Sequence, residues 1–441
     1  MAETTAIPAV KAKLGLRDVT LMSIACIMGT RWIPAAAHAG PGSILLWLAA
    51  ALLFAAPLAD AAGALAVKYP GSAGGLYVWT REDFGPWHGF LCFWVYWIGI
   101  AFLLPTAALF YMSAGFTALG PKYSHLGDNR FYLLAAALVA IWIALGTNLR
   151  GVDVGKWTQN VGAIACWALG VALVLLAVLV SAKRGSATPI HVLPKFNWET
   201  VNFWSNIAYG LSGVEMAAMM AAEIRDPART IPRAVNRSIW IVAILYLTMN
   251  LSILGVIPWQ EAMKSTNIAA VVMERVYGRP IAVAFTWLVI WAVVACMFSI
   301  TLGYSRIPYA AARQGDFFSP FAWLHPRGRF PIVSLLTLGS LTAVCCYFPL
   351  QDVIDAAVAV RILIMFIGQT IGLHLLRKLR PDFPLPFRMR LYPLPSLIAL
   401  VGWIFLLATS NWQVLATALG VTASGVPVFF VWKWFKSRES A

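Results

Sequence analysis

The chain has 441 residues, of which 60% are hydrophobic and only 12% are charged. Soluble domains carry about 25% charged residues, so this composition excludes a soluble globular protein and indicates an integral membrane protein. The formal net charge of +15 would suit nucleic-acid binding, but most basic residues lie between apolar runs, where they report topology. No nucleic-acid partner is therefore expected. All six cysteines lie in apolar runs, which indicates small buried side chains rather than a disulfide framework.

Twelve runs are long and apolar enough to cross a bilayer, which takes about 20 residues each. They lie near residues 20–39, 43–67, 88–118, 131–148, 158–182, 204–224, 237–257, 281–305, 332–348, 353–376, 394–410 and 412–432. Of the 33 Lys and Arg residues, 23 lie on the side of the N-terminus, 8 on the other side and two, Arg31 and Arg361, within the runs. Because cytoplasmic segments are the basic ones, we expect a multi-pass plasma (inner) membrane protein with both termini in the cytoplasm.

The first apolar run is interrupted in its middle. Leu21–Gly42 reads as a membrane helix broken at Gly29–Pro34, with Arg31 near the centre of the apolar span. An arginine at that depth costs roughly 2.5–3.5 kcal/mol unless it faces a cavity or a partner. Non-helical backbone is tolerated there only where protein or water covers its polar groups. This stretch therefore predicts a helix opened around a polar ligand.

The sixth run, 204–224, carries a second interruption. Gly210, Ser212 and Gly213 cluster in its middle, and Glu215 follows within the apolar sequence. If spans one to five and six to ten are repeats, each opens with a broken helix, and an odd number of spans forces opposite orientations.

The expected organisation is a tail at 1–17, a first repeat at 18–182, an extracellular loop at 183–203, a second repeat at 204–376, a cytoplasmic loop at 377–393, helices 11 and 12 at 394–432 and a tail at 433–441.

Several short strings along the chain are distinctive. They are Ile27–Arg31 (IMGTR), Tyr69–Pro86 (YPGSAGGLYVWTREDFGP), Gly213–Glu215 with Ala222–Arg233 (AEIRDPARTIPR), Ser305–Gly315 with His325–Pro326, and Leu385–Arg388 with Tyr392–Pro393. Together they resemble the amino acid–polyamine–organocation (APC) superfamily of permeases from about residue 14 to 435, and the string at Ala222–Arg233 is the most specific.

This resemblance implies an all-α fold of twelve transmembrane helices, with a leucine-transporter-type 5+5 inverted repeat plus two C-terminal helices. It implies transport of amino acids or related amines by proton coupling, sodium coupling or exchange. By the same resemblance, Thr30 lies near the substrate carboxylate, Tyr209 is an aromatic lid and Glu215 is an acidic residue that senses protons. The chain departs from the family pattern at Arg31 and Trp32, in a shorter stretch from Gly29 to Gly40, and at Ala64, where many members have a glutamate.

The two interruptions supply the expected substrate site. A broken helix exposes N–H groups at the start of its second half, where roughly half a positive charge favours a carboxylate. The residues expected to supply these groups are Gly29, Thr30, Gly210, Ser212 and Gly213. The alternative is that these glycines only allow close helix packing, as small residues do in membranes.

Arg31 has three interpretations, which the sequence leaves open. It binds a substrate carboxylate, it is a fixed cation in the place of sodium, or it pairs with Glu215 or Asp60 to lock the helices. The second interpretation predicts transport that does not need sodium. Glu215 is the first candidate for proton coupling and Asp60 the second, because a carboxylate within an apolar span is functional by default. Ser299 and Thr301 are expected to bond back to their own helix.

The sequence therefore predicts a secondary active permease that moves amino acids by alternating access, sodium-independent and either proton-coupled or exchanging. Two alternatives remain: a carboxylate or amine permease with Arg31 binding a non-amino-acid anion, and a transport-dead membrane sensor. No enzymatic activity, cofactor or metal is expected, since no catalytic or metal-binding spacing occurs. The expected partners are the amino-acid substrate and the lipid bilayer, and a homodimer is left open.

Overall fold

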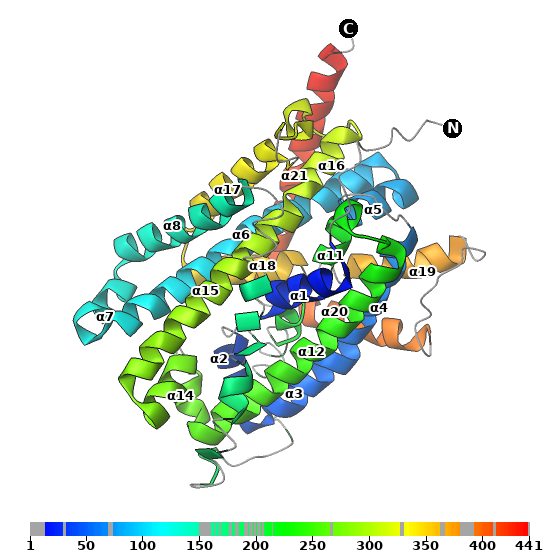
Figure 1. Cartoon of the computed structure of the whole chain (residues 1–441). Helices are drawn as coiled ribbons and strands as arrows, with labels where there is room; N and C mark the ends of the chain where they lie inside the picture. The colour runs from blue at the N-terminus through cyan, green and yellow to red at the C-terminus, as the bar shows by residue number, and fades with distance from the viewer. Residues whose placement is uncertain are drawn as a thin grey trace.

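The computed structural model describes residues 14–29, 32–68, 74–149, 207–213, 215–264, 268–326, 330–361, 367–379, 392–408 and 412–439, with short stretches between 160 and 204. Most of these residues are helical (Figure 1). The sole β-type contact within the described ranges is a bridge between Leu14 and Ile224.

The helices of the first half of the chain are α1 (Leu16–Ile27), α2 (Trp32–Ala37), α3 (Ser43–Ala50), α4 (Ala56–Lys68), α5 (Leu76–Phe84), α6 (Pro86–Leu119), α7 (Pro121–Asp128) and α8 (Arg130–Leu149). Those of the second half are α11 (Met216–Met219), α12 (Pro227–Val256), α13 (Trp259–Ala262), α14 (Ile268–Tyr277), α15 (Arg279–Tyr304), α16 (Arg306–Arg313), α17 (Ile332–Cys345), α18 (Leu350–Arg361), α19 (Gln369–Leu379), α20 (Leu394–Ala408) and α21 (Trp412–Glu439).

Six helical segments among the described residues are long and apolar enough to cross a membrane. They are Gly40–Ala66, Pro86–Phe116, Arg130–Leu149, Pro227–Val256, Arg279–Arg313 and Leu415–Arg438. Two shorter apolar helices, α17 and α20, add to them. The all-helical, multi-pass character predicted from the sequence is confirmed, and the count of twelve spans with its inverted repeat stays a prediction.

The first apolar run is two helices rather than one, as predicted. α1 ends at Ile27, α2 begins at Trp32, and Met28 between them has extended backbone. The position of Pro34 differs from the expectation, because it lies within α2 and not in the interruption. Proline is tolerated in the first turn of a helix, where its missing N–H would have no partner in the helix. The break therefore falls between Ile27 and Trp32, and Pro34 helps to start the second half.

Five short helices among the described residues lie outside the predicted spans: α5, α7, α13, α14 and α16. Figure 1 shows α5 and α16 near one end of the molecule and α7 and α14 at the opposite end. α5 lies within the string Tyr69–Pro86, between the second and third predicted spans. The last residues of α21 lie at the same end as α16 (Figure 1).

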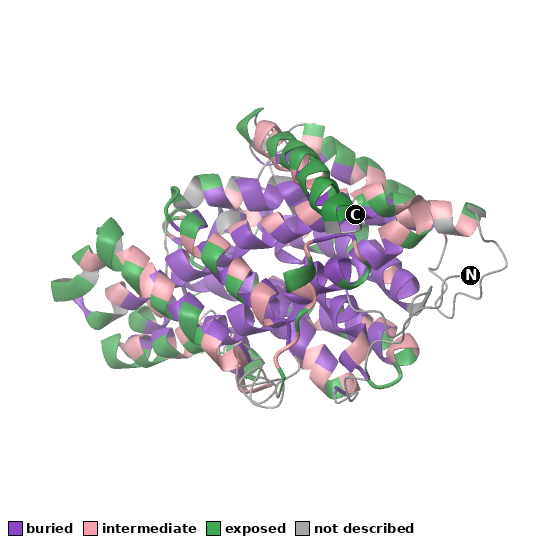
Figure 2. Ribbon diagram, turned by 90° about the horizontal axis from the view of Figure 1, so that it is seen from above, coloured by how far each residue is buried: buried purple, intermediate pink, exposed green. Residues whose placement is uncertain are grey.

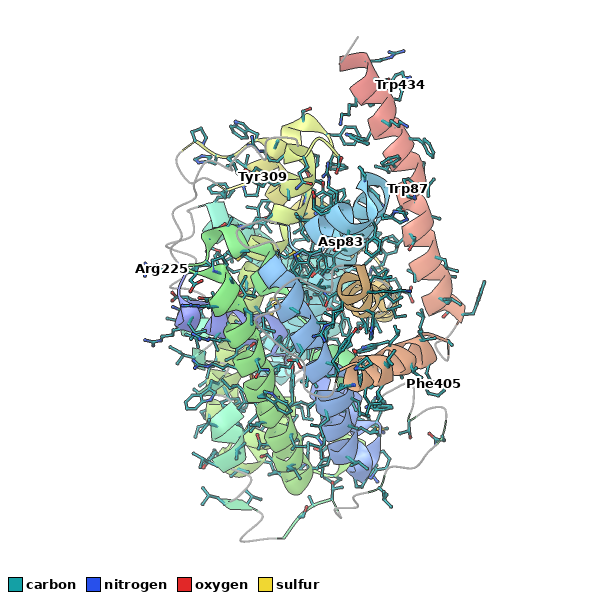
Figure 3. All side chains as sticks on the ribbon, turned by 90° about the vertical axis from the view of Figure 1, so that its right-hand side faces the viewer. Asp83, Trp87, Arg225, Tyr309, Phe405 and Trp434 are labelled. Carbon is teal, nitrogen blue, oxygen red and sulfur yellow. The ribbon has the colours of Figure 1, made fainter. Side chains whose placement is uncertain are left out.

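The buried core lies where the long helices cross. α4 packs along α12, α1 along α12 and α15, and α6 along α15 and α18. Gly63 permits a close approach of α4 to α12, since a Cβ there would lie 3.4 Å from the Cα of Pro232. Figure 2 shows buried residues through the middle of the molecule and exposed ones at its rim. Figure 3 shows α21, which carries Trp434, running along the outside.

Candidate functional site

The two interrupted helices meet at their breaks. A Cβ at Gly213 would lie 3.4 Å from the Sγ of Cys26 and 3.4 Å from the Cγ1 of Ile27, at the end of α1. Gly213 has φ +117°, which a residue with a side chain rarely adopts. The second helix therefore opens at Gly213 because only glycine combines this backbone with such a close approach. Helix 207–210 precedes the break and α11 follows it.

A pair of aromatic rings forms a second contact between the two interrupted helices. The rings of Trp32 and Tyr209 lie 5.1 Å apart in an edge-to-face arrangement. Gly210 lies against the same indole, and a Cβ there would be 3.0 Å from the Cγ of Trp32. Both aromatic residues are buried. The start of α2 thus packs directly against the end of helix 207–210. A larger residue at position 210 would push the two helices apart.

The hydroxyl of Tyr246, from α12, stabilises the open end of α1. It accepts a hydrogen bond of 2.7 Å from the Gly29 amide and donates one of 3.0 Å to the carbonyl of Ile27. Gly29, Ile27 and Tyr246 are buried. Backbone groups that leave a helix inside a membrane need such partners, because no lipid can supply them. The interruption is therefore a structural feature fixed by α12 and not a frayed helix end.

Glu215 lies at the centre of a hydrogen-bond network that joins three membrane helices. Its Oε1 accepts hydrogen bonds from the hydroxyls of Tyr96, on α6, at 3.2 Å and of Tyr304, on α15, at 3.1 Å. Its Oε2 accepts one of 3.1 Å from the amide of Gly213. The side chain of Glu215 is fully buried. A change in the charge of Glu215 would therefore alter its hydrogen bonds to the second break, to α6 and to α15.

The structure brings six of the predicted site residues together. Gly29, Tyr209, Gly210, Ser212, Gly213 and Glu215 all lie in or beside the two breaks. Thr30 and Arg31 lie outside the described residues. Asp60 lies apart from this group of contacts: it is on α4, and its carboxylate is hydrogen-bonded to the side chain of Asn236 on α12.

The backbone amides differ from the expectation in one respect. We expected the amides of the breaks to be free for a substrate carboxylate, but those of Gly29, Ser212 and Gly213 are engaged within the protein. Their acceptors are the hydroxyl of Tyr246, the carbonyl of Tyr209 at 2.9 Å and the carboxylate of Glu215. A carboxylate that binds to these amides must therefore displace an internal partner, and at Gly213 that partner is the glutamate itself.

Three tyrosines of this site, Tyr96, Tyr246 and Tyr304, are not among the residues predicted from the sequence. Each lies within a long apolar run, where a buried hydroxyl normally has a hydrogen-bond partner, so the signal was present but did not identify the partner. The expectation for the hydroxyls of α15 is confirmed, since Ser299 donates to the Ala295 carbonyl at 2.9 Å and Thr301 to that of Met297 at 2.8 Å.

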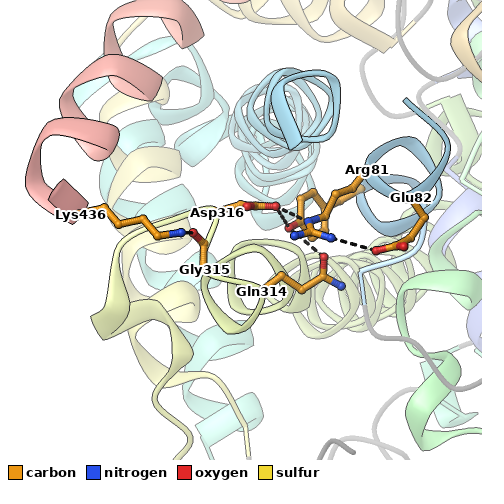
Figure 4. Close-up of polar contacts among 7 residues, drawn as sticks. Arg81, Glu82, Gln314, Gly315, Asp316 and Lys436 are labelled. Carbon is orange, nitrogen blue, oxygen red and sulfur yellow. Dashed lines mark hydrogen bonds and ion pairs between the residues drawn. The ribbon is translucent and has the colours of Figure 1, made fainter. Parts of the chain in front are cut away.

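A second group of polar contacts lies at the end of the molecule that carries α5 and α16 (Figure 4). Arg81 and Tyr77, both on α5, donate to the Oδ2 of Asp316 at 2.5 Å and 2.6 Å. Lys436, on α21, donates to the Gly315 carbonyl at 2.5 Å. Burial, and then the charge of Asp316, raise the pKa of the Tyr77 hydroxyl, which therefore stays protonated and donates. The segment after α16 is thus tied to both α5 and α21.

A buried ion pair lies where the second interrupted helix ends, at the end of the molecule that carries α16. The Nε of Arg306, the first residue of α16, is 2.5 Å from the Oε1 of Glu223, and both side chains are buried. Next to Glu223, the bridge between Leu14 and Ile224 ties the segment before α1 to the end of this helix. The bridge thereby joins the start of the first interrupted helix to the end of the second.

These features define a multi-pass helical membrane protein in which two interrupted helices meet at a buried carboxylate. The family model of amino acid permeases matches residues 14–433 of the chain. The chain therefore belongs to the amino acid permease family, within the APC superfamily, and this family consists of transporters and not of enzymes.

Characterised and uncharacterised transporters resemble the chain over most of its length. An uncharacterised transporter of Legionella pneumophila is 29% identical over 79% of this chain and 76% of its own length. The branched-chain amino acid permease of Bacillus subtilis is 24% identical over 98% of this chain and 95% of its own. A probable GABA permease of Pseudomonas aeruginosa is 24% identical over 91% and 89%. The protein is thus a membrane transporter of amino acids.

Proposed function

We propose that the protein is a secondary active amino acid permease of the plasma membrane that works by alternating access around the junction of its two interrupted helices. The observation that carries this proposal is the contact of the two breaks at Gly213, next to the fully buried Glu215. Substrate sites at the ends of discontinuous helices are the plan of many secondary transporters. We extend the proposal to twelve spans in two inverted repeats, 18–182 and 204–376, each of which opens with an interrupted helix.

The proposed orientation places the end with α5 and α16 in the cytoplasm, together with both termini. It is supported by the excess of Lys and Arg on that side, 23 against 8. In this orientation the contacts of Asp316 and of Arg306 close the cytoplasmic side. Opening this side requires that these contacts separate, which is the step that alternating access demands.

The amino acid carboxylate is proposed to bind where the second halves of the interrupted helices begin. The amides there and the partial positive charge of a helix N-terminus favour an anion. Substrate entry is then coupled to Glu215, because the amide of Gly213 is bound either by that glutamate or by the substrate. Arg31 supplies a further positive charge to the carboxylate, or stands in place of sodium, or pairs with an acidic side chain.

Proton coupling is proposed to act through Glu215. An ionised carboxylate can only accept hydrogen bonds, whereas a protonated one donates one. Protonation at Oε1 would reverse its bond to either Tyr96 or Tyr304, because a tyrosine hydroxyl can also accept. Protonation would also weaken the hold on the Gly213 amide. Proton binding and release of that amide would thus occur together, and Asp60 remains the second candidate.

Uptake of a radiolabelled amino acid panel into proteoliposomes tests this function. A proton gradient is imposed without sodium, and Glu215→Gln, Arg31→Ala and Asp60→Asn are compared with the unchanged protein. We expect saturable uptake that depends on the proton gradient, and a Glu215→Gln variant that still exchanges substrate but no longer responds to pH. Unchanged pH dependence in this variant would refute the role of Glu215. Steep sodium dependence at constant pH would refute the sodium-independent mechanism.

A fully inactive but folded protein that is thermally stabilised by an amino acid would instead indicate a sensor. An exchanger is distinguished from it by loading the vesicles with unlabelled substrate, which restores uptake only in an exchanger.

A further inference from the structure

A cavity of about 630 Å³ lies beside α1, outside the junction of the interrupted helices. Three helical segments line it: one face of α1, the described part of the fifth apolar run around Trp167, and α12 at Arg237 and Ile241. This volume falls within the range of about 300–1,000 Å³ that is typical of small-molecule sites. The cavity is therefore large enough for part of an organic ligand, and no residue of the proposed amino acid site lines it among those the structure describes.

The lining combines two arginines with apolar side chains. Arg17 and Arg237 are exposed, while Thr20, Ile24 and Ile241 continue the same helix faces toward the interior. α1 and α12 begin at the same end of the molecule, because Leu14, just before α1, pairs with Ile224, just before α12. Arg17 is the second residue of α1, and Ile24 follows two turns later. Arg17 on α1 and Arg237 on α12 both line the cavity, together with apolar side chains of the two helices.

The arginines are available to a ligand. Neither Arg17 nor Arg237 forms an ion pair with any residue in the described ranges. The acidic residue next to Arg17 is Asp18, whose carboxylate accepts hydrogen bonds from the amide of Gly15 at 3.0 Å and from Asn160 at 3.3 Å. The fifth apolar run also exposes large apolar groups here, since Ile164 and Trp167 are 47% and 51% exposed.

We propose that this cavity binds an anionic phospholipid of the cytoplasmic leaflet. Its phosphate lies between Arg17 and Arg237, and part of an acyl chain fills the apolar space along Ile24, Ile241 and Trp167. Arginine recognises phosphate through charge-assisted hydrogen bonds, and basic residues at this depth attract anionic lipids. The side assignment rests on the orientation given under the proposed function, whereas the charge and shape of the cavity do not depend on it.

The lipid would act on transport through α1. This helix forms one wall of the cavity and ends at the first break, so a bound lipid stabilises the present arrangement of α1 against α12. Anionic lipid is then a regulator of the step in which α1 moves. A soluble phosphate would lack the acyl chain and so would not bind comparably.

Lipid binding to the purified, delipidated full-length protein tests this proposal without any transport measurement. Native mass spectrometry and thermal unfolding are recorded with added phosphatidylglycerol, with phosphatidylcholine of the same chains, and with glycerol phosphate. We expect saturable binding and stabilisation by phosphatidylglycerol alone. The double variant Arg17→Gln/Arg237→Gln should weaken its binding about thirtyfold, which corresponds to about fivefold for each arginine.

Two further variants separate charge from shape. Leu21→Trp fills the cavity from α1 while it keeps both arginines, and it should also weaken binding. Arg229→Gln/Arg438→Gln removes two exposed charges that do not line the cavity, and it should bind as the unchanged protein does. The proposal is overturned by equal binding to Arg17→Gln/Arg237→Gln, by equal binding of phosphatidylcholine, or by glycerol phosphate that binds as tightly as the lipid. Failed amino acid uptake would not affect this result, because binding is measured without substrate.

Discussion

The hydroxyl of Tyr246 and the amide of Gly29 are 2.7 Å apart, although 217 residues separate them in the chain. This bond and the one from the same hydroxyl to the Ile27 carbonyl join α12 to the point where the first interrupted helix opens. The ring of Tyr246 is held independently, since it stacks on that of Trp47 with centroids 4.5 Å apart. The hydroxyl can therefore be removed without displacing the ring.

Tyr246→Phe should destabilise the protein by about 1–3 kcal/mol, the usual cost of leaving buried polar groups without a partner. The amide of Gly29 and the carbonyl of Ile27 both lose this hydroxyl. Thermal unfolding in detergent measures the effect. Tyr132→Phe is the control, because Tyr132 is 47% exposed on α8. A Tyr246→Phe variant as stable as the control would show that other groups stabilise the break.

Gly213→Ala should abolish uptake in a protein that still folds. The residue has φ +117°, and its new Cβ would lie 3.4 Å from two side-chain atoms of α1. The backbone strain of an alanine at this φ costs of order 1–3 kcal/mol, and it destabilises the junction of the two breaks. Gly146→Ala is the matched control, since a Cβ there meets nothing within 4 Å in α8. Uptake into proteoliposomes at equal protein content compares them, and normal transport by Gly213→Ala would contradict our account of the junction.

Arg306→Met should destabilise the protein by about 3–5 kcal/mol, because it leaves the buried carboxylate of Glu223 without its partner. Replacing both residues, as Glu223→Met/Arg306→Met, should recover part of this loss. The comparison pair is Glu261 and Arg275, which are both 41% exposed. Breaking it with Glu261→Gln should cost no more than about 1 kcal/mol. Equal shifts of the unfolding temperature at both sites would show that burial of the Arg306 pair does not matter.

Asp316→Asn should loosen α5 from the segment after α16, because Arg81 and Tyr77 lose their charged acceptor. Hydrogen bonds to charged groups are worth about 1.5–3 kcal/mol, so local opening should increase roughly 10- to 100-fold. The buried thiol of Cys92 reports this opening, since it lies against the Leu76 carbonyl of α5. Its labelling rate, followed by mass spectrometry, should rise by that factor.

Glu82→Gln is the control for this measurement. Glu82 also contacts Arg81, at 2.9 Å, but its side chain is 41% exposed and does not reach α16. Its replacement should leave the labelling of Cys92 unchanged. If Asp316→Asn behaves in the same way, the contacts in Figure 4 do not keep this end closed.

Parts of the fold could be predicted closely from local sequence. The apolar run at 131–148 corresponds to α8 at Arg130–Leu149, and the run at 88–118 to α6 at Pro86–Leu119. The position of the first break was predicted by Gly29. The start of α12 was not: it begins at Pro227, ten residues before the predicted span, because its first turns are polar and lie beyond the apolar run. Apolar length reports the part of a helix inside the membrane and not the whole helix.

The glycines of the candidate site and Glu215 could be predicted from the sequence, whereas its tyrosines could not. Tyr96 and Tyr304 lie 119 and 89 residues from Glu215 in sequence, so no local pattern connects them. The hydroxyl of a single tyrosine in an apolar helix could bond to many different partners on neighbouring helices. Which of them is used depends on how α6 and α15 pack around the second break.

The sequence by itself determined that this is a helical membrane protein of the permease type, and where its first and sixth apolar runs are interrupted. These properties follow from apolar length, charge distribution and residues such as Gly213, each of which acts locally along the chain. Only the tertiary structure decided which groups satisfy the opened backbone, that Asp60 pairs with Asn236 on α12, and that Arg17 and Arg237 share one cavity. The reason is that a buried polar group must find its partner in space, and the packing of distant helices determines which partner is near.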